Sequence, residues 1–160
     1  MAHGLWHQAE IDDLIQEAKD NETEIPIMVI KSMIMDQIVE MLDTTGAVRN
    51  TNKLGKLLML REKRSSTGLA HGVAIPHVRT DDMKEFTMCI ILPSTPIPYD
   101  TVDGEPVSII VGMASPTYDD DVHLKILAKL SSLLSYDSFR QELLDTYSPG
   151  EVIYLFRREE

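Results

Sequence analysis

The spacing of the apolar residues changes twice along the chain, and this change constrains the fold more than any other feature of the sequence. Before residue 61 the apolar residues recur every three or four positions, which is the pattern of helices with one buried face. Segments 73–75, 86–92 and 107–113 are instead short apolar runs, rich in β-branched residues and separated by turn signals. From residue 119 the helical spacing returns. Helices that flank several strands predict an α/β domain, an α+β sandwich.

The first polar break in this pattern indicates a boundary within the chain. Residues 1–7 have no periodic pattern, whereas residues 9–19 fit a short amphipathic helix. The polar stretch 20–23 follows this helix. We therefore expect residues 1–24 to be an N-terminal appendage, and residues 25–160 to be the main domain.

Later helices have ends that the sequence marks clearly. The residues at 44–46, Thr-Thr-Gly, are expected to end one helix. One of the residues at 50–52 is expected to cap the next helix, which carries Arg61 in its last turns. Ser148 and Pro149 are typical of the cap and first position of a C-terminal helix.

The balance of charge limits the possible partners, and the single cysteine indicates the cellular location. The sequence has 15 Lys and Arg against 26 Asp and Glu, for a formal net charge of −11. Such a chain repels phosphate backbones and anionic lipid, so we expect no nucleic acid and no membrane surface as a partner. No run of about 18 apolar residues and no signal-peptide layout is present. Cys89 lies in an apolar run and is expected to be a buried thiol of a cytoplasmic protein.

Two of the five histidines lie where a functional side chain is expected. His77 follows Pro76 at the end of the apolar run 73–75, and binding groups are often found at such strand ends. His123 opens the most strongly patterned helix, whose N-terminus favours a nearby anion and a neutral imidazole. The other histidines, for which we expect no role, are His3, His7 and His71.

Together with their neighbours, these residues suit phosphoryl transfer. A phosphoryl carrier needs a nucleophile that is largely neutral at cytoplasmic pH, and imidazole meets this need unaided. It also needs positive charge and hydrogen-bond donors for the phosphoryl oxygens. His77 would be the nucleophile, with Arg61 as a bidentate fork and His123 as a second donor. Ser66 and Thr67 would bind the phosphate through their hydroxyls. No cofactor is implied.

The same residues also have simpler interpretations. Arg61 fits a helix-end cation that satisfies the last carbonyl groups of its helix. Ser66 and Thr67 fit turn-forming residues beside Gly68. Residues 62–64 are expected to be a solvated charged end of the helix.

The motifs around these residues resemble a known family. They are Arg61-Glu62-Lys63, Ser66-Thr67-Gly68, Gly72-Val73-Ala74-Ile75-Pro76-His77, and His123-Leu124 with Leu127-Ala128 and Leu130. In order and separation they resemble the enzyme IIA domains of the bacterial phosphoenolpyruvate-dependent phosphotransferase system, in the mannitol/fructose branch that includes the nitrogen-related regulatory protein. The resemblance covers about residues 25–158.

The resemblance implies both a fold and a reaction. The implied fold is a mixed sheet with helices on both faces. The implied reaction is acceptance of phosphate on His77 from the histidine phosphocarrier protein, with Arg61 and His123 assisting. The phosphate is then passed to an enzyme IIB or kept as a regulatory signal. Two features depart from the family: Val78 replaces the usual glycine after the histidine, and the usual first strand is hard to see at 24–29.

Other functions remain open on the sequence. A free-standing chain without a visible IIB or IIC segment favours the regulatory branch over sugar transport. A non-catalytic interaction module of the same fold is an alternative, with the N-terminal helix as its docking arm. A metal-dependent hydrolase would use His71, His77, His123 and nearby Asp residues, but the histidine spacing matches no compact metal motif.

Overall fold

The computed structural model of the protein describes residues 2–3 and 7–160. In chain order, its elements are β1 (Ala2–His3), α1 (Gln8–Asp20), α2 (Ile27–Asp43), α3 (Thr51–Arg64), β2 (Val73–Ala74), β3 (His77–Arg79), β4 (Thr87–Leu92), β5 (Ile109–Ser115), α4 (Asp120–Leu133), α5 (Asp137–Leu144) and α6 (Pro149–Arg158). The unpatterned stretch 1–7 therefore lies largely outside the described residues, although residues 2–3 form a strand. None of the described helices has the length and apolar character needed to span a bilayer.

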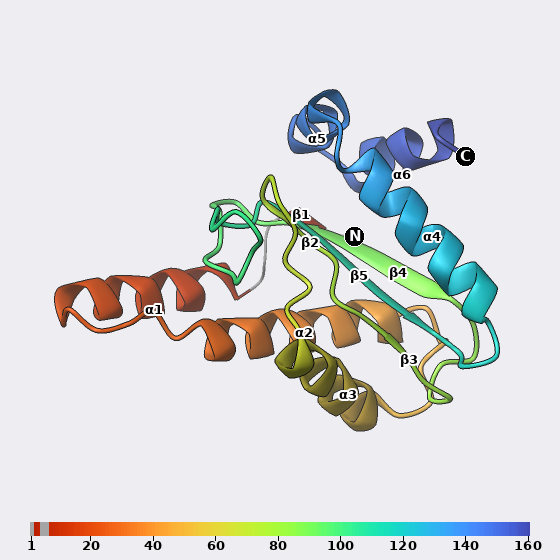
Figure 1. Cartoon of the computed structure of the whole chain (residues 1–160), viewed down its shortest axis with the longest axis horizontal. Helices are drawn as coiled ribbons and strands as arrows, with labels where there is room; N and C mark the ends of the chain where they lie inside the picture. Colours follow the sequence, from red (N-terminus) through yellow and green to blue (C-terminus); the bar gives the residue numbers. More distant parts are fainter. Residues whose placement is uncertain (1, 4–6) are drawn as a thin grey trace.

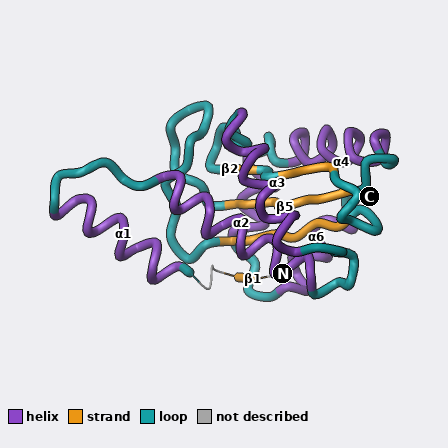
Figure 2. The backbone as a smooth tube through the Cα atoms, turned by 90° about the horizontal axis from the view of Figure 1, so that it is seen from below, coloured by secondary structure: helices purple, strands orange, loops and turns teal. Residues whose placement is uncertain are grey.

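The described strands form one mixed sheet that is covered on both faces. Their order is β1-β4-β5-β2, and β3 also pairs with β5. β4 and β5 are antiparallel, whereas β1 is parallel to β4, and β2 and β3 are parallel to β5. Figure 1 shows α2 and α3 against one face and α4 to α6 against the other. Figure 2 is the view from below, in which α2 and α3 lie over the strands. This arrangement confirms the predicted α/β sandwich.

The central strands are buried on both faces, which explains why their sequences are unbroken apolar runs. Cys89 and Ile91 of β4 belong to the apolar cluster under α1, α2 and α3. The alternate residues Ile90 and Leu92 belong to the opposite cluster, under α4, α5 and α6. Gly112 of β5 allows α2 to pack closely, because a Cβ there would lie 2.7 Å from a side-chain carbon of α2. Cys89 is buried, as predicted, and burial raises the pKa of its thiol to about 12.

The predicted helix ends are confirmed by the local geometry. Gly46 follows the end of α2 with a φ of 78°, in the left-handed region that glycine adopts readily. The side chain of Asn50 caps α3 by accepting a hydrogen bond of 3.0 Å from the backbone N–H of Lys53. Ser148 caps α6 in a capping box, and Pro149 is the first residue of that helix.

The strand that leads to His77 does not end where the sequence predicts. β2 stops before Pro76, but pairing with β5 resumes at His77, the first residue of β3. Pro76 has no N–H to donate, yet its carbonyl accepts a hydrogen bond of 3.0 Å from the N–H of Met113. The register relative to β5 is the same before and after this break. His77 therefore lies within the sheet edge, not beyond it.

The predicted solvated end over residues 62–64 is wrong for one of its members. Glu62 is 3% exposed, and its Oε1 lies 2.9 Å from Nζ of Lys31, which is 2% exposed. Lys31 lies on α2, so the partner that allows this carboxylate to be buried comes from another helix. Lys63 and Arg64 are exposed, as predicted.

The N-terminal helix packs on the main core. Ile11 of α1 is fully buried in the apolar cluster that α2 and α3 share. The described segment 24–29 contains no strand, since α2 begins at Ile27. The boundary after residue 24 stays a prediction.

Candidate active site

A pocket of about 400 Å³ lies between the last turns of α3, strand β3 and the first turns of α4. Arg61, His77 and His123, which the sequence analysis singled out, all line it. Two further cations, Arg64 and Arg79, line it as well, and the other lining residues are apolar. No carboxylate from the described part of the chain lines this pocket. A chain with a net charge of −11 thus contains one concavity whose charged groups are all positive, which suits a small anion.

The hydrogen bond of His77 leaves one ring nitrogen available for chemistry. Its Nδ1 lies 2.6 Å from the carbonyl oxygen of Ile75. Because a carbonyl oxygen only accepts, Nδ1 carries the hydrogen and donates it. Burial lowers the pKa of His77, the bond to Ile75 partly opposes this, and the charge of Arg61 lowers the pKa further. In the neutral ring that results, Nε2 has a free lone pair.

His123 lies in the first turn of α4 and is 3% exposed. Its ring centroid is 5.6 Å from that of His77, with the two planes at 51°. Its Nδ1 lies 2.6 Å from the hydroxyl oxygen of Ser115. Burial first, and then the proximity of His77 and Arg79, lowers the pKa of His123 to about 4. The ring is therefore neutral near pH 7 and can donate only one N–H.

Arg61 has a structural contact and also lines the pocket. Its Nη1 donates a hydrogen bond of 2.8 Å to the carbonyl oxygen of Ser65, the residue that follows α3. The helix-end interpretation is therefore correct, and it does not exclude the functional one. The contact holds the guanidinium at the end of α3, where its charge acts on the ring of His77.

Arg64 and Arg79 are site residues that the sequence analysis did not name. Arg79 lies two positions after His77 on β3, and side chains at this spacing point to the same face of a strand. Arg64 lies three positions after Arg61 on α3, and such residues are neighbours on a helix surface. These two spacings were the available signals. Arg79 forms an ion pair with Asp120 at the start of α4.

Ser66 and Thr67 do not line the pocket. Ser66 Oγ lies 3.2 Å from Oε1 of Glu62, and the backbone N–H of Thr67 donates to the same oxygen at 3.0 Å. The hydroxyl of Thr67 donates to Oε2. Burial alone would raise the pKa of Glu62, but the hydrogen bonds from Lys31 and Thr67 lower it overall. The hydroxyl of Ser66 also lies 2.5 Å from the carbonyl oxygen of Asp100. Both hydroxyls thus have partners within the protein, and their predicted contact with phosphate gains no support from this placement.

His71 lies outside the pocket. It adopts a φ of 64° in a turn, where its backbone N–H donates a 2.9 Å hydrogen bond to Asp103. His71, His77 and His123 therefore do not converge. Across residues 2–3 and 7–160, no three His, Cys, Asp or Glu side chains are grouped so that they could hold a metal ion.

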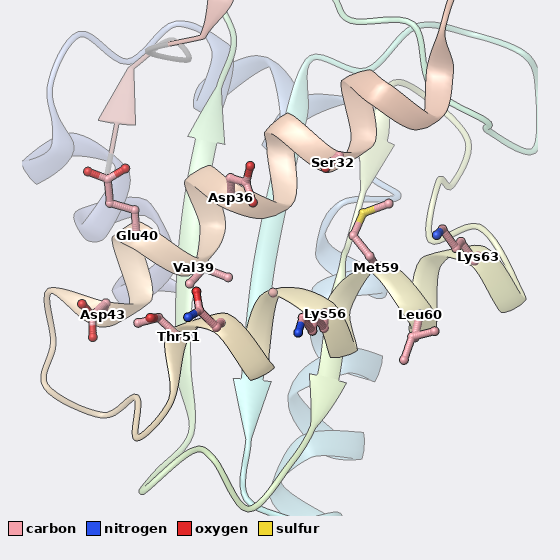
Figure 3. A pocket seen from close by; sticks show the side chains of 12 residues that line it. Ser32, Asp36, Val39, Glu40, Asp43, Thr51, Lys56, Met59, Leu60 and Lys63 are labelled. Atoms are coloured by element: carbon pink, nitrogen blue, oxygen red, sulfur yellow. The ribbon is translucent and has the colours of Figure 1, made fainter.

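A larger groove, of about 720 Å³, lies between α2 and α3 (Figure 3). Asp36 and Glu40 on α2 line one side, and Lys56 and Lys63 on α3 line the other. Its charges are mixed, and none of its lining residues in the described chain is a histidine or cysteine. The smaller pocket is therefore the one in which two histidines and three arginines meet.

Comparisons with known proteins show the family and the fold to which this chain is similar. A family model described as "Phosphoenolpyruvate-dependent sugar phosphotransferase system, EIIA 2" matches residues 15–159. The fructose-specific EIIABC component of Bacillus subtilis is 27% identical over 130 residues, which are 81% of this chain and 20% of that protein. The chain thus spans about a fifth of the length of that relative.

Two solved structures share the fold. The nitrogen regulatory protein IIA-Ntr of Neisseria meningitidis superposes with a TM-score of 0.71 and 32% identity, over 78% of this chain and 85% of that one. The mannitol enzyme IIA of Escherichia coli, solved in complex with phosphorylated enzyme IIB, gives a TM-score of 0.67 at 20% identity, over 78% and 85% of the two chains. The match over residues 15–159 shows that the chain belongs to the EIIA type 2 family of the phosphoenolpyruvate-dependent sugar phosphotransferase system.

Proposed function

We propose that this protein is a phosphoryl carrier that accepts phosphate on Nε2 of His77. The observation that carries this proposal is the hydrogen bond from Nδ1 of His77 to the carbonyl of Ile75. It leaves the lone pair on Nε2, in a pocket whose charged lining residues are all cationic. A neutral imidazole with a fixed tautomer is a nucleophile that needs no separate base.

The proposed step exchanges one P–N bond for another. The lone pair of His77 Nε2 attacks the phosphorus of a phosphohistidine on the donor protein. The new P–N bond forms at His77 while the donor's P–N bond breaks. The donor ring carries a hydrogen on its other nitrogen, so it keeps the electron pair of the broken bond and leaves as a neutral imidazole, while the positive charge of the ring passes to His77. His77 keeps the hydrogen on Nδ1 throughout, bonded to Ile75. In passage to the next acceptor, the acceptor's nucleophile bonds the phosphorus while the P–N bond at His77 breaks, and the electron pair of that bond returns to Nε2.

The other pocket residues stabilise charge on the phosphoryl oxygens. Arg61 supplies a fixed positive charge at the end of α3, and His123 supplies an N–H from the start of α4. Such preorganised donors lower the barrier because they need no rearrangement as charge develops in the transition state. Arg64 adds positive charge at the pocket edge, and Arg79 adds less because Asp120 pairs with it.

The proposed partners follow from the family. The proposed donor is the histidine phosphocarrier protein, and the acceptor is an enzyme IIB or a regulatory target in the cytoplasm. The relatives support both routes: one is a fructose-specific EIIABC component, another is a nitrogen regulatory protein, and a third was solved with phosphorylated IIB. The negative net charge of the chain suits a donor with a basic face.

Phosphorylation with purified components tests the proposal. The protein is incubated with phosphoenolpyruvate, enzyme I and the histidine phosphocarrier protein, and bound phosphate is measured. We expect an acid-labile, base-stable label that is lost in His77→Ala and kept in the control His71→Ala. An unlabelled wild-type protein would contradict the proposal and favour a non-catalytic interaction module.

A further inference from the structure

We infer that Ser115 is a positioning residue that fixes His123 in the tautomer with its hydrogen on Nε2. The consequence for transfer depends on the function proposed above, because Nε2–H is the donor that His123 offers to a phosphoryl group on His77. The tautomer itself does not depend on that function. It is a property of the unphosphorylated protein.

The surroundings of Ser115 decide the direction of the hydrogen bond. Ser115 is the last residue of β5 and is fully buried. Its Oγ lies 2.6 Å from Nδ1 of His123, and in the described part of the chain it has no other hydrogen-bond partner. A buried hydroxyl hydrogen needs an acceptor, and Nδ1 is the acceptor within reach. The Oγ–H of Ser115 therefore donates to Nδ1, and the hydrogen of the neutral ring is on Nε2.

The opposite arrangement would be worse for two reasons. If Nδ1 of His123 carried the hydrogen and donated it to Ser115, the serine hydroxyl hydrogen would have no acceptor in a dry site. In addition, Nε2 would present a lone pair to the anionic group on His77. A doubly protonated ring is disfavoured as well, because it would place a charge in a buried site beside His77 and Arg79.

The backbone holds Ser115 firmly in place. Ser115 pairs with Arg79 in the β3–β5 register, and the carbonyl oxygen of Ser115 accepts a 2.8 Å hydrogen bond from the N–H of Thr80. Ser115 thus occupies a defined position relative to β3, the strand that begins with His77. Because the hydroxyl of Ser115 is hydrogen-bonded to Nδ1 of His123, it also fixes the position of that ring.

The tautomer can be measured directly by two-bond 1H–15N NMR on the unphosphorylated protein near pH 7. We expect His123 to be in the Nε2–H form in the wild type and in Ser115→Thr, and to be a mixture of tautomers in Ser115→Ala. Ser132→Ala, the same change at an exposed position of α4, is the control and should match the wild type. A wild-type His123 in the Nδ1–H form would overturn the inference, even if Ser115→Ala did not fold.

Transfer kinetics test the functional half. The initial rate of His77 labelling should fall roughly tenfold in Ser115→Ala, and Ser115→Thr should restore most of it. Equal rates and unchanged tautomers in Ser115→Ala would overturn the role of Ser115. If the wild type were not labelled at all, the proposed function would fail, while the NMR result would still decide the tautomer.

Discussion

Two groups of polar side chains lie near the end of α3, and two consecutive residues of that helix, Arg61 and Glu62, belong to different groups. Glu62 belongs to a buried cluster with Lys31, Ser66, Thr67 and Tyr99. Arg61, one position earlier, lines the pocket with the two histidines. In the buried cluster the polar groups bind one another. In the pocket, His77 and Arg61 each form one hydrogen bond to a backbone carbonyl, and both residues line the open volume of the pocket.

This difference separates polar groups that bind one another from polar groups that are available to a ligand. The carboxylate of Glu62 receives hydrogen bonds from Lys31 and Thr67, and the hydroxyl oxygen of Ser66 lies 3.2 Å from it. The ammonium of Lys31 also lies 4.5 Å from the ring centroid of Tyr99. His77 bonds one carbonyl, and Arg61 bonds another. Donors and lone pairs that remain available in a concavity are what a ligand requires. Buried groups that already satisfy one another do not need one.

The largest effect should come from opening the buried cluster. Lys31→Ala leaves the carboxylate of Glu62 buried without its counter-charge, and we expect the free energy of unfolding to fall by about 3–5 kcal/mol. Lys56→Ala, on the exposed face of α3, should change it by less than about 0.5 kcal/mol. Denaturant unfolding measures both. If Lys31→Ala and Lys56→Ala are equally stable, the buried pair has no structural role.

The pocket should make stability depend on pH in the acid range. The pKa of His123 falls from 6.5 to about 4 on folding, so between these values the unfolded chain binds more protons. The contribution of His123 to the free energy of unfolding is therefore fully present above pH 6.5, and it falls by up to about 3 kcal/mol as the pH falls towards 4. His123→Gln should flatten this part of the curve. An unchanged pH dependence in that variant would show that His123 does not titrate in this way.

Removing a donor from the pocket should slow transfer while leaving the fold intact. Arg61→Ala and His123→Ala should each slow phosphorylation of His77 by about 100-fold, because each removes a donor from a developing anion. Their far-ultraviolet circular dichroism should match that of the wild type. Lys63→Ala, an exposed cation on the same helix, is the control for net charge. Labelling of Arg61→Ala at the wild-type rate would contradict its assignment.

The smallest effect should come from Thr67, and it sharpens the comparison. Thr67→Val removes the hydroxyl that donates to Glu62, and we expect a loss of about 1 kcal/mol in stability with little change in transfer rate. This outcome would assign Thr67 to the buried cluster. A transfer rate lowered by tenfold or more would instead support the direct phosphate contact that the sequence predicted.

The sequence predicts most of the fold because its signals are local. Asn50 caps α3 and Ser148 caps α6 through hydrogen bonds that reach only three residues. The alternation of buried faces along β4 follows from its own apolar residues. The break at Pro76 was interpreted as the end of a strand, since nothing near it in sequence reveals that β5 continues to pair beyond it.

The site is less predictable because its contacts are distant in sequence. His77, His123 and Arg61 were selected by residue type and family motif, but their meeting in one pocket depends on the sheet. Glu62 was assigned to solvent because its partner, Lys31, lies on another helix. Ser115 precedes His123 by only eight residues, but no sequence pattern indicates their contact. The contact depends on the turn between β5 and α4, which brings the hydroxyl of Ser115 to the ring.

The unbroken register of β2 and β3 along β5 has a consequence for partner exchange. His77 lies opposite Met113, and two residues further along the same strand Ser115 bonds the second imidazole. Two residues of one central strand, two positions apart, thus contact both rings: Met113 pairs with His77, and Ser115 bonds His123, which α4 carries. A partner protein that binds α3 or the exposed side of α4 would contact His77 and His123, whose spacing depends on their contacts with β5. The proposed carrier would therefore present the same geometry to a donor and to an acceptor of different shape.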